Sequence, residues 1–118
     1  MRKKIIILGS TGSIGKATLE VIENQHDEFE VVGLACKGSA DLLNKQILKF
    51  KPKYVCVDDG PIKNKIHFEK SRLLNGIEGI KEMVRMDGEI VVNALPGSAG
   101  LEPTIEALKM NKVLALAN

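Results

Sequence analysis

Residues 3–15 read Lys-Lys-Ile-Ile-Ile-Leu-Gly-Ser-Thr-Gly-Ser-Ile-Gly. The apolar, mostly β-branched run at residues 5–8 predicts a buried strand. After Gly12, apolar or small residues recur with helical spacing, at Ile14, Ala17, Thr18, Val21 and Ile22. The glycines of this stretch therefore lie on a turn that leads from a first strand into a first helix.

A turn of this kind favours the binding of a phosphate. Backbone N–H groups and the N-terminal end of the helix face outward together there. We expect Gly9 to allow the tight turn, Gly12 to let a pyrophosphate approach the backbone, and Gly15 to let the helix pack close to the strand. The spacing is G-x-x-G-x-x-G, not the usual G-x-G-x-x-G fingerprint, and a glycine-rich turn without a ligand is the alternative.

The composition is that of one ordinary globular domain. The 118 residues are 44% hydrophobic and 27% charged, with a net charge of +2 and only 3% aromatic residues. This balance gives no support to a nucleic-acid partner or a membrane surface, and no apolar run has membrane-spanning length. Cys36 and Cys56 fall in predicted strands, and we expect reduced thiols of a cytoplasmic protein rather than a disulfide.

Strand-like and helix-like segments alternate along the whole chain. Strands are predicted at residues 29–35, 53–57, 89–94 and 113–118, with a short one at 72–74. Three sets of apolar residues mark the later helices: Leu42, Leu43, Ile47 and Phe50; Ile77, Ile80, Met83 and Val84; Leu101, Ile105 and Leu108. The alternation predicts an α/β fold, a Rossmann-like doubly wound and mainly parallel sheet with helices on both faces.

The end of the second predicted strand indicates which dinucleotide would bind. An acidic residue here would accept a hydrogen bond from the ribose 2′-hydroxyl of NAD. This chain instead has Cys36, Lys37, Gly38 and Ser39. Lys37 supplies a cation for a 2′-phosphate, and Ser39 is placed to cap the next helix and offer its hydroxyl. The pattern favours NADP, the alternative being that Lys37 is an ordinary surface lysine.

A second glycine-bearing turn spans residues 93–101, again between a strand and a helix. In an open parallel sheet this strand usually lies beside the first one, so the tips of both turns would face one crevice. Small residues there would let the chain pass close to a nicotinamide ring. The alternative is ordinary turn chemistry, with Pro103 starting the next helix.

Two stretches resemble the family of 1-deoxy-D-xylulose 5-phosphate reductoisomerase. One is Gly-Ser-Thr-Gly-Ser-Ile-Gly at residues 9–15. The other is Asn-Ala-Leu-Pro-Gly-Ser-Ala-Gly-Leu-Glu-Pro-Thr at residues 93–104, which leads to Leu-Ala-Leu-Ala-Asn at 114–118. The second stretch is much the more specific. The resemblance covers nearly the whole chain in the same order, with a poor match at residues 63–70.

The resemblance implies an NADPH-binding domain. It implies that Thr11, Gly12, Ser13 and Ile14 hold the pyrophosphate, and it places Asn118 at the cofactor. The chain departs from the family where Cys36-Lys37-Gly38 stands in place of a usual Gly-Lys-Asn. Together with the two turns, the candidate cofactor-binding residues are Gly9, Thr11, Gly12, Ser13, Ile14, Gly15, Cys36, Lys37, Gly38, Ser39, Ala94, Leu95 and Asn118.

The resemblance also sets expectations for the parent enzyme. It would convert 1-deoxy-D-xylulose 5-phosphate to 2-C-methyl-D-erythritol 4-phosphate with NADPH and a divalent metal, Mg or Mn, as a homodimer. We expect residues 1–118 to be an N-terminal fragment, inactive alone, with no catalytic residue and no metal ligand of its own, because the catalytic and C-terminal domains are absent. The alternatives are a domain of another NADP-dependent oxidoreductase, such as a semialdehyde or sugar dehydrogenase, and a non-catalytic NAD(P)-sensing module.

Overall fold

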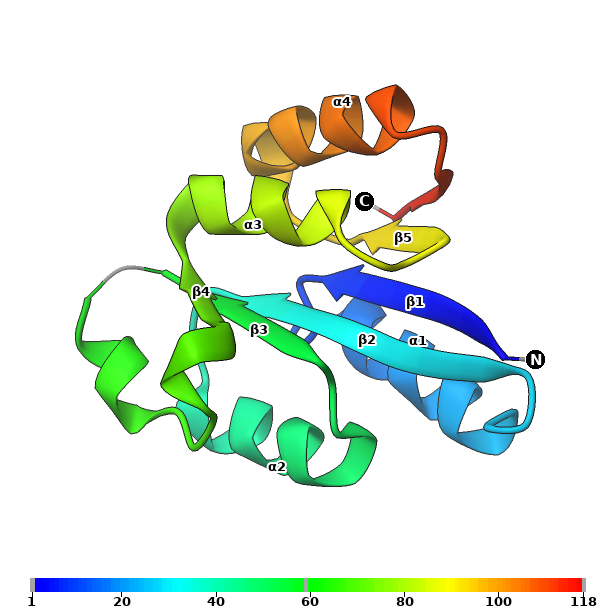
Figure 1. Ribbon diagram of the computed structural model, residues 1–118. Coiled ribbons are helices and arrows are strands. Elements are labelled where there is room, and N and C mark those ends of the chain that lie inside the picture. Colours follow the sequence, from blue (N-terminus) through cyan, green and yellow to red (C-terminus); the bar gives the residue numbers. More distant parts are fainter. Residues whose placement is uncertain (1, 59, 118) are drawn as a thin grey trace.

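A single parallel sheet organises the chain, of which the computed structural model describes residues 2–58 and 60–117. Its strands are β1 (Lys3–Leu8), β2 (Phe29–Cys36), β3 (Tyr54–Val57), β4 (Leu73–Asn75), β5 (Ile90–Asn93) and β6 (Val113–Leu116). They lie in the order β4-β3-β2-β1-β5-β6, and all five described pairings are parallel (Figure 1). Every predicted strand is present, with ends that differ by one or two residues.

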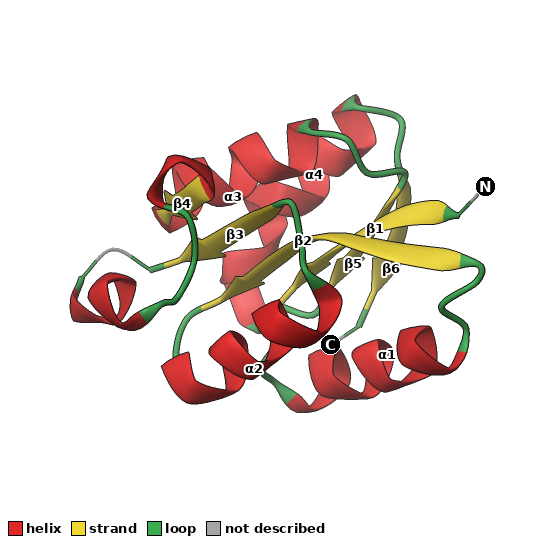
Figure 2. Ribbon diagram, turned by 60° about the horizontal axis from the view of Figure 1, so that its bottom comes forward, coloured by secondary structure: helices red, strands yellow, loops and turns green. Residues whose placement is uncertain are grey.

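Helices cover both faces of the sheet, as the doubly wound class requires. The helices α1 (Ser13–Asn24) and α2 (Ala40–Phe50) lie on one face, and α3 (Gly76–Arg85) and α4 (Leu101–Lys109) lie on the other (Figures 1 and 2). Short 3₁₀ segments occupy Pro61–Lys65, Lys70–Arg72 and Gly97–Gly100. The predicted fold class is therefore confirmed. None of the described helices has the length and apolarity that crossing a bilayer would demand.

The alternation of β1 divides the core into two layers. Ile5 and Ile7 face α1 and α2, where they join Leu43 and other apolar residues. Ile6 and Leu8 face the opposite way and pack with the α3 and α4 side of the sheet. All four side chains are buried, since β1 is covered on both faces and has a neighbouring strand on each side.

The order in which the chain adds strands to the sheet reverses at β1. The chain moves from β1 to β2, β3 and β4 on one side, and then returns to β5 on the other side of β1. The expectation that the strand at residues 89–94 lies beside the first one is confirmed, with Leu8 opposite Asn93. The carboxyl ends of β1, β2 and β5 thus meet at one edge, where an open α/β sheet binds its ligands.

The cysteines lie in neighbouring strands but face opposite layers of the core. Cys36 packs on the α1 and α2 side, and Cys56 packs on the α3 and α4 side. Both thiols are buried and free. Side chains that point to opposite faces of a sheet cannot meet in a disulfide, so Cys36 and Cys56 do not pair with each other.

The apolar spacing correctly predicts that α1 is a helix, but it does not predict which face of α1 is buried. Gly15, Leu19 and Ile22 are buried, whereas Ile14 and Val21 are exposed. The reason is the close approach at Gly15, which rotates the row containing this glycine toward the sheet. Helix positions shifted by one residue differ by about 100° in direction, so this contact decides the buried row.

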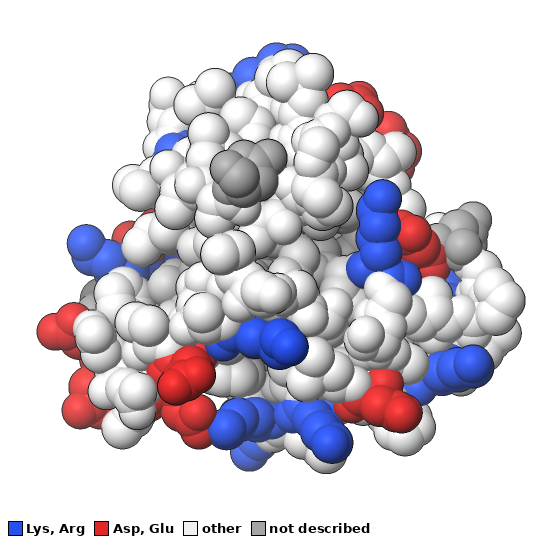
Figure 3. Space-filling model, turned by 180° about the vertical axis from the view of Figure 1, so that it is seen from behind, with Lys and Arg blue, Asp and Glu red and all other residues white. Residues whose placement is uncertain are grey.

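The apolar residues of α4 and β6 are also directed outward. Leu101 is 60% exposed and Val113 is 63% exposed, and Ile105, Leu108 and Leu116 are exposed as well. Helix α4 instead packs on the sheet through the buried residues Pro103 and Ala107. In the view of Figure 3, the upper part of the molecule shows fewer charged side chains than the lower part, where basic and acidic residues are interspersed with uncharged ones.

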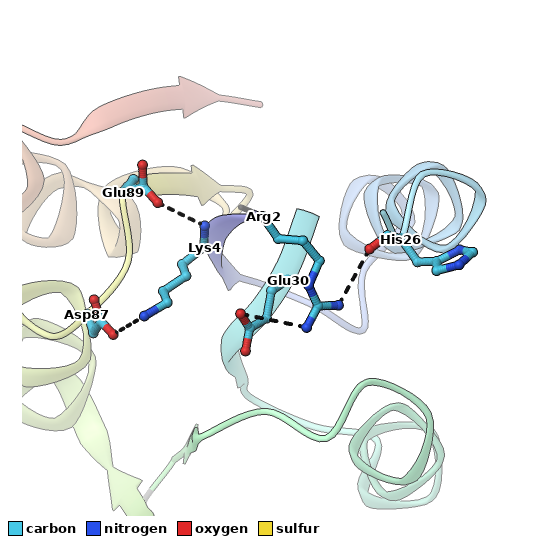
Figure 4. A network of polar contacts seen from close by, with 6 residues as sticks. All are labelled: Arg2, Lys4, His26, Glu30, Asp87 and Glu89. Carbon is cyan, nitrogen blue, oxygen red and sulfur yellow. Dashed lines mark hydrogen bonds and ion pairs between the residues drawn. The ribbon is translucent and has the colours of Figure 1, made fainter. Parts of the chain in front are cut away.

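Charged residues join the strands at the edge opposite the glycine turns. The contacts in Figure 4 involve Arg2, Lys4, His26, Glu30, Asp87 and Glu89. The Lys4 ammonium lies 2.6 Å from a carboxylate oxygen of Asp87, and the Lys4 N–H donates to Glu89 at 3.2 Å. The Lys4 ammonium lowers the pKa of Asp87. These contacts tie β1 to the segment that enters β5.

Candidate functional site

The first glycine turn lies at the carboxyl end of β1 and touches the neighbouring β-strand ends on both sides. The N–H groups of Gly9 and Ser10 both donate to the Ala35 carbonyl of β2, at 2.7 and 3.0 Å. Gly9 has φ +88°, and a Cβ there would lie 2.8 Å from the carbonyl oxygen of Ala94. Gly9 therefore serves both the left-handed backbone and the close packing of the two turns.

Gly12 and Gly15 differ in what they require of their surroundings. A Cβ on Gly15 would lie 2.1 Å from the Gly9 carbonyl oxygen, so no larger residue fits without a backbone shift. Gly12 has φ −79° and ψ 175°, which any residue adopts. A Cβ on Gly12 would meet only the Gly9 carbonyl oxygen, at 3.7 Å, which is ordinary contact. The fold thus demands glycine at position 15 but not at position 12.

The N-terminal end of α1 offers an uncompensated positive end of a helix dipole. Helix α1 begins at Ser13 and carries no acidic residue in its first turn. Gly12, Ser13 and Ile14 are exposed, and Thr11 is partly buried beside them. The structure therefore brings the four residues expected to hold the pyrophosphate together at one accessible helix start.

The turn after β2 lies beside the first turn. Lys37, Gly38 and Ser39 are exposed, whereas the Cys36 side chain is buried and donates to the Gly38 carbonyl at 3.1 Å. Burial raises the pKa of the Cys36 thiol to about 11, and the nearby Thr11 side chain offsets part of that rise. Cys36 can therefore face a ligand only through its backbone, while its thiol points into the core.

Ser39 occupies the N-cap position of α2 but does not cap it with its side chain. Its backbone has φ 62° and ψ 62°, and its hydroxyl makes no capping hydrogen bond. The left-handed conformation turns the side chain away from the first N–H groups of the helix, since a capping serine usually has extended backbone. The prediction of a hydroxyl cap at Ser39 is wrong in this respect, and the hydroxyl stays at the exposed turn.

A hollow of about 270 Å³ connects the turns after β2, β3 and β5. Its lining residues are Lys37, Asp58, Ile77, Ile80, Leu95, Ser98, Ala99 and Glu102. It brings Lys37 together with Leu95, two residues that the sequence placed in separate turns. Asp58 and Glu102 also line it, although the sequence favoured a turn-capping role for Asp58 and gave no signal for Glu102.

The second glycine turn is held by the side chain of Asn93, the last residue of β5. The Asn93 amide nitrogen donates to the Gly100 carbonyl at 2.9 Å and to the Thr104 hydroxyl at 2.8 Å. Its oxygen accepts the Leu95 N–H at 3.2 Å. Asn93 is only 3% exposed, and all its polar atoms have partners. This role of Asn93 was not predicted, because its only signal in the sequence is an amide that ends an apolar strand.

Ala94 and Leu95 follow Asn93 across the edge of the sheet. The Ala94 N–H donates to the Leu8 carbonyl at 2.9 Å, which fixes this turn to β1. Leu95 is buried in the α3 and α4 layer of the core, although its edge lines the hollow. The expectation that small residues in this turn let the chain pass close to a nicotinamide ring therefore fits Ala94, whereas Leu95 is large and also packs in the core. Asn118 lies outside the described residues.

The described residues contain no group of three or more His, Cys, Asp or Glu side chains that could hold a metal ion. What they do contain is a helix start and two turns that converge on one edge. These features fit a phosphate-bearing ligand laid across β1, β2 and β5.

Comparison with known proteins identifies the group to which this architecture belongs. The family model for 1-deoxy-D-xylulose 5-phosphate reductoisomerase matches residues 5–118. The chain belongs to the 1-deoxy-D-xylulose 5-phosphate reductoisomerase family. Membership excludes the alternative of an unrelated semialdehyde or sugar dehydrogenase.

Relatives of this reductoisomerase family match over almost the whole chain. The reductoisomerase of Caldanaerobacter subterraneus subsp. tengcongensis is 49% identical over 119 residues, which cover 98% of this chain and 31% of that protein. The enzyme of Thermoanaerobacter sp. is 47% identical, with the same coverage. The chain thus spans about a third of the length of the curated relatives it matches.

Solved reductoisomerase structures share the fold. The Zymomonas mobilis enzyme in complex with NADPH superposes with a TM-score of 0.89 at 27% identity, over 100% of this chain and 32% of that one. A reductoisomerase in complex with NADPH, fosmidomycin and magnesium gives 0.87 at 29% identity, over 98% and 30% of the two chains. The Rossmann-like sheet is thus common to this chain and to these structures.

Proposed function

We propose that this chain is the NADPH-binding part of a reductoisomerase that converts 1-deoxy-D-xylulose 5-phosphate to 2-C-methyl-D-erythritol 4-phosphate. The observation that carries the proposal is the open space at Gly12. Its backbone conformation suits any residue and no atom of the fold crowds it, so folding does not explain a glycine there. A pyrophosphate that contacts the backbone does explain it, since a side chain would stand in its way.

The chemistry of the edge supports an assignment of each part of the cofactor. The pyrophosphate lies on the N–H groups of Thr11 and Ser13 and beside Gly12 and Ile14, at the start of α1, since the Gly12 N–H already donates to the Gly9 carbonyl at 3.3 Å. Gly9 and Gly15 do not contact the pyrophosphate in this assignment; they allow the turn and α1 to pack closely together. The nicotinamide end lies along Ala94 and Leu95, whose turn packs directly on Gly9. A role for Asn118 stays a prediction of the resemblance.

Lys37 supplies the preference for the 2′-phosphate. It is exposed on the turn after β2, with Gly38 and Ser39 beside it and the backbone of Cys36 before it. An ammonium group attracts a phosphate dianion, whereas Asp58 across the same hollow repels one. The net preference for NADPH over NADH therefore depends on Lys37, and Asp58 reduces it.

NADPH supplies the hydride when it is bound, and this chain holds the cofactor in position. The relatives are about three times as long as this chain. We assign the sugar phosphate site and the ligands of a divalent metal, Mg or Mn, to that additional length. We therefore expect the 118-residue chain to have no reductoisomerase activity. Turnover by the purified chain would contradict this assignment.

The parent enzyme is further proposed to be a cytoplasmic homodimer. The two free, buried thiols support a reducing compartment. The homodimer follows from the resemblance alone, and sedimentation of a full-length relative measures it directly.

Calorimetric titration with NADPH and with NADH tests the proposed function. We expect NADPH to bind more tightly, by about 1–3 kcal/mol, the scale of a charge-assisted contact. Lys37→Ala should remove most of that difference and leave NADH binding unchanged. Lys45→Ala is the matched control, since Lys45 is an exposed lysine of α2 that does not line the hollow. Equal binding of both dinucleotides would exclude the role of Lys37, and absence of binding would overturn the proposed function.

A further inference from the structure

The buried side-chain amide of Gln46, on α2, forms a hydrogen bond to the first glycine turn. Gln46 lies in the buried row of α2 with Leu43 and Ile47 and is only 6% exposed. Its Nε2 donates to the carbonyl of Ser10 at 2.9 Å. The orientation of this amide is determined, because the reversed amide would place an oxygen against the carbonyl oxygen.

This contact sets the direction of one peptide unit of the turn. In the described part of the chain no backbone N–H donates to the Ser10 carbonyl, so Gln46 alone holds it. A trans peptide is planar, and its C=O and N–H groups point in opposite directions. Because the Ser10 carbonyl points inward to Gln46, the N–H of Thr11 points outward, where the described backbone offers it no acceptor.

Two buried polar atoms beside this contact lower the stability of the fold, because they have no hydrogen-bond partner within residues 2–58 and 60–117. The Ser10 hydroxyl and the Gln46 Oε1 are both buried, and neither has a hydrogen-bond partner among the described residues. A leucine in place of Gln46 would continue the apolar row and would not bury the unpaired Oε1. Unpaired buried polar atoms in a folded protein call for an explanation. One explanation is that Gln46 is needed to hold the backbone of a binding site.

We propose that Gln46 is a positioning residue for the dinucleotide pyrophosphate. By holding the Ser10 carbonyl inward, it presents the Thr11 N–H to a pyrophosphate oxygen before the ligand arrives. This inference rests on the proposed NADPH function and adds a residue that is 36 positions from the turn it orients. The effect falls on the pyrophosphate and leaves the 2′-phosphate contact at Lys37 as it is.

The test is Gln46→Met, which keeps the length of the side chain and removes the donor. Leu48→Met is the matched control, because Leu48 is on the same helix and 78% exposed. We expect Gln46→Met to raise the Kd for NADPH and for NADH alike, by about 10-fold, the scale of one lost hydrogen bond to a buried group. Binding of adenosine 2′-monophosphate, which has the 2′-phosphate and lacks the pyrophosphate, should change less than about twofold.

The outcomes separate the two proposals. If the wild-type chain binds no dinucleotide, the proposed function falls and the role of Gln46 falls with it. If wild type binds NADPH and a folded Gln46→Met binds it equally well, only the positioning role is overturned. Equal weakening of NADPH and of adenosine 2′-monophosphate would make Gln46 merely structural and would also overturn it. Should circular dichroism show Gln46→Met unfolded, Gln46→Asn, whose amide is one carbon too short to reach Ser10, is measured by the same readouts.

Discussion

Gly15 packs backbone against backbone on Gly9, and a methyl group on Gly15 would lie 2.1 Å from the Gly9 carbonyl oxygen. Gly15→Ala must therefore push α1 away from the turn. We expect a loss of about 3 kcal/mol in the free energy of unfolding, the upper part of the range for overpacking. Urea denaturation followed by circular dichroism measures it. If Gly15→Ala is as stable as wild type, α1 can move away from the turn without a loss of stability, and the close packing at Gly15 does not stabilise the fold.

Gly12→Ala should give the opposite pattern. The position has extended backbone and open space, so the free energy of unfolding should change by less than about 1 kcal/mol. The added methyl group occupies the approach of the pyrophosphate, and the affinity for NADPH should fall by about 10-fold or more. Denaturation and titration on one sample separate the two effects. Unchanged NADPH affinity in this variant would remove the main support for the proposed site.

Asn93→Ala tests the amide that holds the second turn. It removes three hydrogen bonds and leaves the Gly100 carbonyl and the Leu95 N–H without this partner. We expect a loss of about 3 kcal/mol in the free energy of unfolding. Thr104→Val is the graded control, since it removes only one of these contacts and should cost about 1 kcal/mol. Equal losses in both variants would contradict a central role for Asn93.

The buried thiols predict a loss of stability at alkaline pH. Burial raises the pKa of Cys36 to about 11 and that of Cys56 to about 12, above the ordinary value of 9.0. Above pH 9.0 the unfolded chain therefore releases thiol protons that the folded chain retains, and unfolding becomes easier as the pH rises. Each thiol should cost about 1 kcal/mol by pH 10.

Urea denaturation at pH 8 and pH 10 measures this alkaline loss. Cys36→Ser keeps a donor for the Gly38 carbonyl and removes one titrating group, so it should lose less stability than wild type over the same interval. An identical pH dependence in the two proteins would show that Cys36 does not contribute.

Local patterns were sufficient to predict the sheet. Each strand is a short apolar run, and the turns between them carry glycine or proline, so existence and order follow from residues close in sequence. The buried faces of α1 and α4 were not predictable in this way. They depend on which residues approach the sheet, Gly15 in α1 and Pro103 and Ala107 in α4, whereas the apolar spacing follows the larger side chains.

The site was predictable where it is made of adjacent residues. The two glycine turns and Lys37 were found because their signals are continuous in the chain. The role of Gln46 was missed, because Gln46 lies on α2 and contacts a turn 36 positions away in the sequence. Which carbonyl the Gln46 amide reaches depends on how α2 packs on the sheet, and that information is not present in any single stretch of sequence.

The outward apolar side chains of α4 and β6 have a consequence for handling the purified polypeptide. Strand β6 is an edge strand, and Val113 and Leu116 are exposed on it. An edge with apolar side chains is a template on which further strands from other molecules can add. Solutions of the 118-residue chain should therefore become turbid at high concentration, and a lysine at position 113 should raise the concentration at which light scattering begins.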